Sequence, residues 1–325
     1  MKKLFALLLA AMLVVSMTAC NSTGMQNGSG DGKYTIGICQ LVQHPALDKA
    51  TAGFIAAVEA GLGKENVTFK TENASGEATN CTSIMNSFVS ANVDLIMANA
   101  TPALAAAYNA TEIIPILGTS VTEYGVALGI KNFSGTVGGN VSGTSDLAPL
   151  DIQAQMILDW VPDAKKVALL YCSTEPNSQY QVDEVEKYLT GKGIECKEFA
   201  FSDASNMNAV TQSAAEWADA IYVPTDNTVA TYATAIDEIC RPAGVPIIAG
   251  ESGICSGCGI ATLSLDYYDL GYKTGEMAVE ILKNGADIST MPIAYTPAEK
   301  LTRSYNEEIC TELGLTPLEG YTKLG

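Results

Sequence analysis

Short hydrophobic runs of strand length alternate with segments of helical periodicity from residue 34 onward. The runs are rich in Val, Ile and Leu, which is typical of strands buried on both faces of a parallel sheet. Steady alternation of strand and helix predicts right-handed crossovers and a mostly parallel α/β sheet. The expected strands are 34–41, 66–71, 93–98, 113–117, 166–171, 194–199, 220–223, 245–249 and 260–263.

The alternation runs twice, in units of roughly 110 residues, which predicts two doubly wound α/β lobes of one design. Between the units, Gly138–Thr144 has the glycine and small polar content of a hinge. One helix is expected to start at His44-Pro45, where Pro45 suits the first turn. The other expected helices are 80–91, 103–111, 178–192, 206–217, 229–243 and 267–283.

We expect the N-terminal lobe to comprise residues 34–143 and 267–290. The C-terminal lobe then comprises residues 144–266 and 291–325. In this arrangement the helix 267–283 returns to the first lobe and the tail crosses back to the second. A hinge of several connections restricts the lobes to opening and closing.

The first twenty residues predict export and lipidation. Lys2 and Lys3 precede an apolar run from Leu4 to Val15, which is the order of a signal peptide and is shorter than the ~20 residues that span a bilayer. The residues before Cys20 are similar to a lipobox, so residues 1–19 are the expected signal peptide and Cys20 the lipidated N-terminus. Residues 20–33, rich in Asn, Ser and Gly, are then a flexible tether.

The formal charge of −18 argues against nucleic acid as a partner, because an acidic surface repels phosphate backbones. Removal of the signal peptide leaves 16 basic residues against 36 acidic ones, a charge of −20. The same charge disfavours adsorption to an anionic membrane, so attachment has to be covalent.

Eight cysteines follow Cys20 at scattered spacing, and we expect few disulfides among them. Cys39 and Cys172 lie in apolar strand runs, where a free thiol packs as a small hydrophobe. The spacing of Cys255 and Cys258 suits either a local disulfide or half of a zinc site. A zinc site needs two further ligands and the chain has one histidine, so no metal is expected.

Catalytic constellations are scarce in this sequence. His44 is the single histidine, and a position beside Pro45 at a helix start favours a pocket-lining role over that of a base. Neither a P-loop nor a Gly-x-Gly-x-x-Gly pattern follows the expected strands. We therefore expect neither an enzyme nor a cofactor.

Polar residues gather where the expected strands end. Ligands of open parallel sheets bind beyond the carboxyl ends of the strands, where helix N-termini present free amides. Ser, Thr, Asn and Asp are also the favoured helix caps, so capping and ligand contact are equally good interpretations of any one position. Six such loops on two lobes favour a polar cleft that suits a zwitterion, whose ammonium group Asp226 or Glu175 can pair with. The candidate ligand-binding residues are Gln43, His44, Thr101, Thr119, Ser120, Glu175, Asn177, Ser178, Asp226 and Glu251.

Five tyrosines provide candidate flat walls for such a cleft, although packing in the core is the commoner fate of these side chains. They are Tyr108, Tyr124, Tyr171, Tyr180 and Tyr222.

Six segments have a distinctive order and spacing: Gln43–Asp48, Ala100–Pro102, Gly138–Asp146, Tyr222–Thr228, Leu265–Gly271 and Thr274–Met277. Together they resemble the ABC-transporter substrate-binding lipoproteins of the tryptophan/tyrosine type. The likeness extends from about Tyr34 to the end of the chain. Where family members usually have an acidic residue before His-Pro, this chain has Gln43, which bears on ligand preference.

The resemblance implies a type I periplasmic-binding fold, with three connections between the lobes, and delivery of an aromatic amino acid to a membrane permease. We expect a monomer that is lipid-anchored on the extracytoplasmic face of the membrane and closes on Trp, Tyr or Phe. Two alternatives stay open: another solute, such as a branched-chain amino acid, sugar or nucleoside, or ligand sensing for a signalling receptor.

Overall fold

A computed structural model describes residues 33–325 of the chain. The expected signal peptide, Cys20 and all but the last residue of the expected tether lie outside the described residues. Within residues 33–325, no helix has both the length and the apolar character that crossing a bilayer requires.

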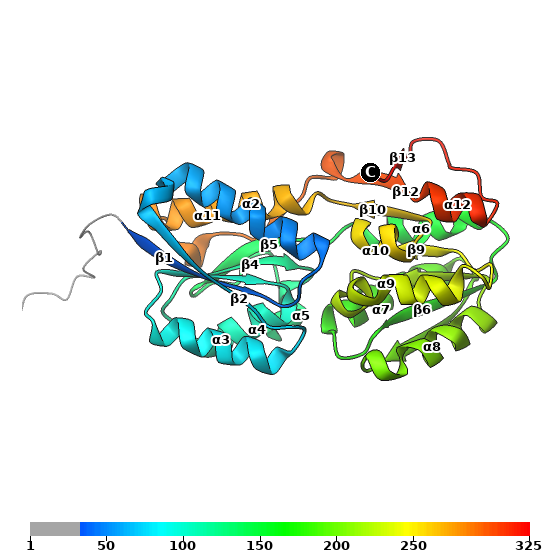
Figure 1. Ribbon diagram of the computed structural model, residues 1–325, viewed down its shortest axis with the longest axis horizontal. Helices are drawn as coiled ribbons and strands as arrows, with labels where there is room; N and C mark the ends of the chain where they lie inside the picture. Colours follow the sequence, from blue (N-terminus) through cyan, green and yellow to red (C-terminus); the bar gives the residue numbers. More distant parts are fainter. Residues whose placement is uncertain (1–32) are drawn as a thin grey trace, which may run out of the picture. The chain divides into compact units, whose positions relative to one another are not determined.

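The first lobe is built on a six-stranded parallel sheet of order β11-β5-β4-β3-β1-β2 (Figure 1). Helices α2 and α11 cover one face of this sheet, and α3 and α4 cover the other. Its strands are β1 (Tyr34–Gln40), β2 (Val67–Asn73), β3 (Leu95–Asn99), β4 (Ile116–Val121), β5 (Val141–Ser145) and β11 (Ala294–Tyr295). Its helices are α2 (Pro45–Leu62), α3 (Ala78–Ser90), α4 (Thr101–Ala110), α5 (Tyr124–Leu128) and α11 (Tyr267–Asn284), with short 3-10 turns η1 (Lys64–Asn66) and η2 (Ile288–Thr290).

The second lobe has a seven-stranded sheet of order β13-β12-β10-β9-β8-β6-β7, in which only the β10–β12 pair is antiparallel. Helices α8, α9 and α10 pack on one face, and α6, α7 and α12 on the other. Its strands are β6 (Lys166–Cys172), β7 (Glu195–Phe201), β8 (Ala220–Val223), β9 (Ile247–Ala249), β10 (Ala261–Ser264), β12 (Thr302–Tyr305) and β13 (Thr322–Lys323). Its helices are α6 (Leu150–Trp160), α7 (Pro176–Gly191), α8 (Ala204–Trp217), α9 (Asn227–Cys240), α10 (Ser252–Cys258), α12 (Glu307–Glu312) and the 3-10 turn η3 (Ala298–Lys300).

Local sequence signals set several helix ends. Pro45, Pro102 and Pro176 lie in the first turns of α2, α4 and α7, where the missing amide hydrogen has no partner to lose. Gly129 and Gly285 end α5 and α11 in the left-handed conformation that glycine adopts without strain. The predicted α/β class with two doubly wound lobes is confirmed.

The chain passes between the lobes three times, through residues 146–149, 265–266 and 296–301. The predicted hinge at Gly138–Thr144 is wrong for its second half, because Val141–Ser145 is the buried strand β5 of the first sheet. Residues 294–295 also pair with β5, so the first lobe extends past the expected limits of 143 and 290. The segment Gly138–Thr144 has three glycines and two hydroxyl residues, which is the composition of a loop.

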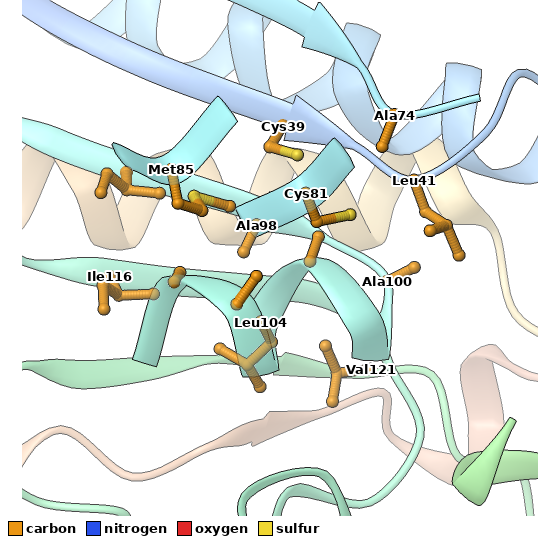
Figure 2. Close-up of a cluster of buried hydrophobic side chains, with 14 of the residues drawn as sticks. Cys39, Leu41, Ala74, Cys81, Met85, Ala98, Ala100, Leu104, Ile116 and Val121 are labelled. Carbon is orange, nitrogen blue, oxygen red and sulfur yellow. The ribbon is translucent and has the colours of Figure 1, made fainter. Parts of the chain in front are cut away.

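All eight cysteines between residues 33 and 325 are free thiols, and only Cys196 is partly exposed. Cys39 of β1 and Cys81 of α3 pack in the core cluster between the first sheet and helices α3 and α4 (Figure 2). Cys255 and Cys258 lie in α10, where their Sγ atoms donate to the carbonyls of Gly259 and Ile254. Within the described part of the chain, no three His, Cys, Asp or Glu side chains group as a metal site would require.

Glycines allow α11 to lie directly against α2. A Cβ atom added at Gly271 would fall 1.9 Å from the carbonyl oxygen of Ala50, and one at Gly53 would fall 2.0 Å from that of Tyr268. Because both obstacles are backbone atoms, a side chain at either position would force the two helices apart. This contact fixes α11 to the first lobe between the second and third crossings.

We expect Gly271→Ala to lower the free energy of unfolding by about 3 kcal/mol or more, because overpacking against backbone cannot relax. Gly191→Ala is the matched control, since Gly191 is exposed in α7 and has no atom near its added Cβ. The control should be neutral or stabilising by up to about 1 kcal/mol. Urea unfolding of both variants makes the comparison, and equal stability would contradict the packing argument.

Candidate ligand-binding site

The carboxyl ends of β3, β4 and β5 lie side by side at one edge of the first sheet. The strand register pairs Asn99 with Thr119, and Val121 with Ser145. Ser120 near the end of β4 and Asp146 just after β5 therefore lie on neighbouring strands of this edge. Helices α4 and α5 begin just beyond the ends of β3 and β4. This edge is where the sequence predicted ligand contacts.

Two non-glycine residues at this edge have strained backbones. Ala100 follows β3 with φ 94° and ψ 159°, a region that is almost restricted to glycine, and Ser120 has φ 53°. The methyl group of Ala100 is buried in the core cluster (Figure 2), so packing holds the conformation. Such strain costs about 1–3 kcal/mol per residue and is concentrated at functional sites. The amino-acid sequence gave no sign of it.

Three acidic residues cap helices at the facing edge of the second sheet. Glu175 accepts from the backbone and side chain of both Asn227 and Thr228 at 2.7–2.9 Å. Asp226 accepts from the amides of Cys172 and Val229 and from Ser178 Oγ, each at 2.8 Å. Glu251 accepts from the amides of Gly253 and Ile254, the second and third residues of α10. In all three carboxylates, both oxygens accept hydrogen bonds.

Burial dominates the protonation of these groups. It raises the pKa of Asp226 well above its usual value, with the charge of Glu175 adding to the effect, and outweighs three hydrogen bonds that lower it. Burial also raises the pKa of Glu251. Burial lowers the pKa of His44, so this imidazole is neutral at neutral pH.

Contacts link the two edges at opposite sides of the site. His44 Nε2 lies 3.4 Å from Oδ1 of Asn227, whose amide group contacts Glu175. On the hinge side, the hydroxyl of Tyr267 donates to Asp146 Oδ2 at 3.0 Å. The two carboxyl edges therefore face each other.

Four buried oxygen atoms at these edges have no hydrogen-bond partner among the described residues: Asn99 Oδ1, Ser120 Oγ, Asp146 Oδ1 and Asn177 Oδ1. A buried polar group without a partner costs about 1–3 kcal/mol. The oxygens of Ser120, Asp146 and Asn177 indicate groups that a bound molecule or ordered water satisfies, whereas the Asn99 side chain bonds to α2 inside the first lobe.

An open cavity of about 570 Å³ lies on the side of the site away from the hinge. Val42 and Pro102 line it from the first lobe, and Glu175, Asn227 and Tyr232 line it from the second. Its volume falls in the range of small-molecule sites. Glu175 is thus both a buried residue of the second edge and part of the lining of this cavity.

Two lobes, three crossings and facing polar edges are the architecture of type I periplasmic-binding proteins. A sequence model of the family described as "ABC transporter substrate binding protein" matches residues 35–322. The chain belongs to this family. Substrate-binding proteins of ABC transporters hold a solute without transforming it, so the expectation of a noncatalytic protein is confirmed.

Three similar proteins extend the comparison. A tyrosine-binding protein from Clostridioides difficile (strain R20291) is 37% identical over 98% of this chain and 94% of its own length. The structure of an ABC domain from Streptococcus pneumoniae in complex with L-Trp is 28% identical, with a TM-score of 0.84 over 89% of this chain and 99% of that one. The ligand-free, open structure of a substrate-binding protein with adhesive properties from Clostridium difficile is 37% identical, with a TM-score of 0.69 over 90% and 99%.

The ten residues predicted for the solute site in this substrate-binding protein differ in their environments. Nine are buried at or beside the two facing edges, whereas Gln43 is exposed on the loop before α2. Thr119 points into the first lobe, where its hydroxyl lies 3.2 Å from that of Thr144. Thr101 is buried at the start of α4 and its hydroxyl has no hydrogen bond to the described residues.

Asp146 and Tyr267 are not among the predicted residues, although Asp146 begins the first crossing and Tyr267 directly follows the second. Asp146 ends the family segment Gly138–Asp146, and nothing in its neighbours distinguishes it from a loop residue. Of the five candidate tyrosines, Tyr124, Tyr171 and Tyr222 are core residues, Tyr180 is half-buried and Tyr108 is exposed on α4.

The bonding of Asp226 leads to a stability prediction. We expect Asp226→Ala to lower the free energy of unfolding of the ligand-free protein by about 2–4 kcal/mol, because three buried donors lose their acceptor. Asp226→Asn should cost less, since Asn also caps helices and no longer repels Glu175. Urea unfolding without ligand tests both variants. Wild-type stability in Asp226→Ala would show that the carboxylate is not a structural cap.

Proposed function

We propose that this chain is the solute-binding component of an ABC importer and closes on an aromatic amino acid in its zwitterionic form. The observation that carries the proposal is the set of unpartnered buried oxygens at two facing sheet edges. An ammonium group supplies donors to such oxygens, and a carboxylate accepts from hydroxyl groups and free helix amides.

The relatives support the aromatic class of ligand. One is named for tyrosine binding and another was solved with L-Trp, and each aligns with about nine-tenths or more of this chain. We take L-tyrosine and L-tryptophan as the first ligands to test, with L-phenylalanine as the third member of the class. The exposed Gln43 does not contact the proposed site directly.

Hinge closure supports capture of the solute. The L-Trp complex has the higher TM-score although the open relative has the higher sequence identity. The open relative is thus more similar to this chain in sequence but less similar in structure. This supports a difference in the arrangement of the lobes, as closure about three crossings would produce. In this proposal the contact between His44 and Asn227 forms when the lobes meet. A ligand that touches both lobes shifts the population toward this closed arrangement.

We further propose that acyl chains on Cys20 hold the protein at the extracytoplasmic face of the membrane. Residues 20–33 then act as a tether that leaves a monomeric two-lobed body free to open, close and meet its permease. The acidic body supports a covalent anchor over electrostatic adsorption.

A thermal-shift screen of the protein tests the ligand class. L-Tyrosine and L-tryptophan at about 100 times their dissociation constants should stabilise the fold by about 2.7 kcal/mol, which raises Tm by several degrees. L-Leucine, glucose and adenosine should leave Tm unchanged. A shift with one of these three and none with aromatic amino acids would assign the protein to another solute class.

Ser120 offers a test of the first-lobe edge. We expect Ser120→Ala to leave the stability of the ligand-free protein unchanged or higher, because the buried hydroxyl has no partner to lose. The affinity for L-tyrosine should fall roughly 3- to 10-fold, the value of one hydrogen bond. Thr211→Val is the matched control, since Thr211 also buries an unpartnered hydroxyl but lies in α8. Equal affinities of the two variants in calorimetry would remove Ser120 from the site.

A further inference from the structure

We infer that the carboxylate of Asp146 binds the ammonium group of the ligand at the hinge end of the site. The hydroxyl of Tyr267 holds the Asp146 carboxylate in position for this contact. This assignment rests on the proposed function and specifies how the zwitterion is oriented. It replaces Asp226 and Glu175 as the expected partners of the ammonium group.

The two oxygens of Asp146 are unequal. Oδ2 accepts the hydroxyl hydrogen of Tyr267 at 3.0 Å, whereas Oδ1 is buried and has no partner among the described residues. The backbone is fixed as well, because the Asp146 amide donates to the carbonyl of Val121. One oxygen therefore holds the carboxylate in place, and the other is free to accept a hydrogen bond.

The other buried carboxylates at the two edges lack such a free oxygen. Each oxygen of Glu175, Asp226 and Glu251 already accepts from an amide or hydroxyl donor within the second lobe. A ligand donor at Glu175 would displace a donor that belongs to the start of α9, because each Glu175 oxygen already accepts two hydrogen bonds. Asp146 can accept a new donor without losing an existing one.

The charge around Asp146 also requires a cation. No lysine or arginine of residues 33–325 forms an ion pair with it, and Glu251 is a second buried carboxylate nearby. Burial raises the pKa of Asp146 to about 6, so the carboxyl group is ionised at neutral pH. An uncompensated buried charge is costly, and a ligand ammonium group compensates it.

Asp146 and Tyr267 lie at the connections between the lobes, so a ligand ammonium group bound there lies at the hinge. Asp146 starts the first crossing and Tyr267 directly follows the second, and the two side chains are hydrogen-bonded to each other. A ligand ammonium group on Asp146 therefore contacts the point where the lobes are joined.

Two ligands that differ only in the amino group distinguish a loss of ammonium binding from general damage to the site. Calorimetry compares L-tyrosine with 3-(4-hydroxyphenyl)propanoate, which has the same ring and carboxylate but no amino group. The wild-type protein should prefer L-tyrosine. Asp146→Asn should weaken L-tyrosine roughly 10- to 100-fold and leave the deamino analogue unchanged, because only the ammonium interaction is lost. The exposed Asp287→Asn is the matched control and should change neither affinity.

A second variant covers the case in which Asp146→Asn does not fold. Tyr267→Phe removes the hydrogen bond to Asp146 Oδ2, and it should weaken L-tyrosine roughly 3- to 10-fold without affecting the deamino analogue. Equal weakening of both ligands, or of neither, in the folded variants overturns the assignment of Asp146. Wild-type protein that binds neither L-tyrosine nor L-tryptophan overturns the proposed function and the assignment with it.

The pH profile gives an independent readout. The ammonium group binds the ionised carboxylate, so L-tyrosine affinity should be full above the pKa of Asp146 and decline as the pH falls through about 6. The titratable groups facing Asp146 are Glu251, Tyr124 and Tyr267, and Lys49 acts on Glu251. Asp146→Asn should remove the decline near pH 6, and a decline that persists in the variant contradicts the assignment.

Discussion

The need of buried polar groups for partners governs the arrangement of this site. Within each lobe, helix caps and strand ladders satisfy the groups at the sheet edges, as the bonds of Glu175 and Asp226 illustrate. Where the two edges face each other the hydrogen bonding is incomplete, because oxygens of Ser120, Asp146 and Asn177 have no partner among the described residues. In the proposed function, a solute with both donors and acceptors bonds to these oxygens and thereby favours closure.

The same constraint explains why the site combines rigid and movable parts. The close contact of α2 with α11 and the strained residues Ala100 and Ser120 hold the first-lobe edge in one geometry. The three crossings allow the second edge to approach it. Asp146 and Tyr267 belong to both systems, since they bind each other at the start of the first crossing and just after the second. In the proposed function, recognition and hinge motion therefore depend on the same residues.

Much of the fold followed from hydrophobic periodicity, because buried parallel strands and amphipathic helices leave strong local patterns. The strand Ala220–Val223 and the return of the helix after Asp266 to the first lobe are examples. The strand Val141–Ser145 was missed because its glycine and hydroxyl residues pack against Gly118 and Thr274 rather than forming an apolar run.

The site was harder to predict than the fold. Polar residues at strand ends located it, but whether a carboxylate caps a helix or keeps an oxygen free depends on tertiary contacts. Glu175 and Asp226 look like ligand partners in the sequence and act as caps in the structure. Asp146 acquires its role from Tyr267, which is 121 positions away in the chain. A crystal structure of the protein with L-tyrosine tests the central claim most directly. The account predicts a ligand between the two edges with its nitrogen in hydrogen-bond contact with Asp146 Oδ1, and a ligand bound to one lobe alone or with its nitrogen away from Asp146 would contradict it.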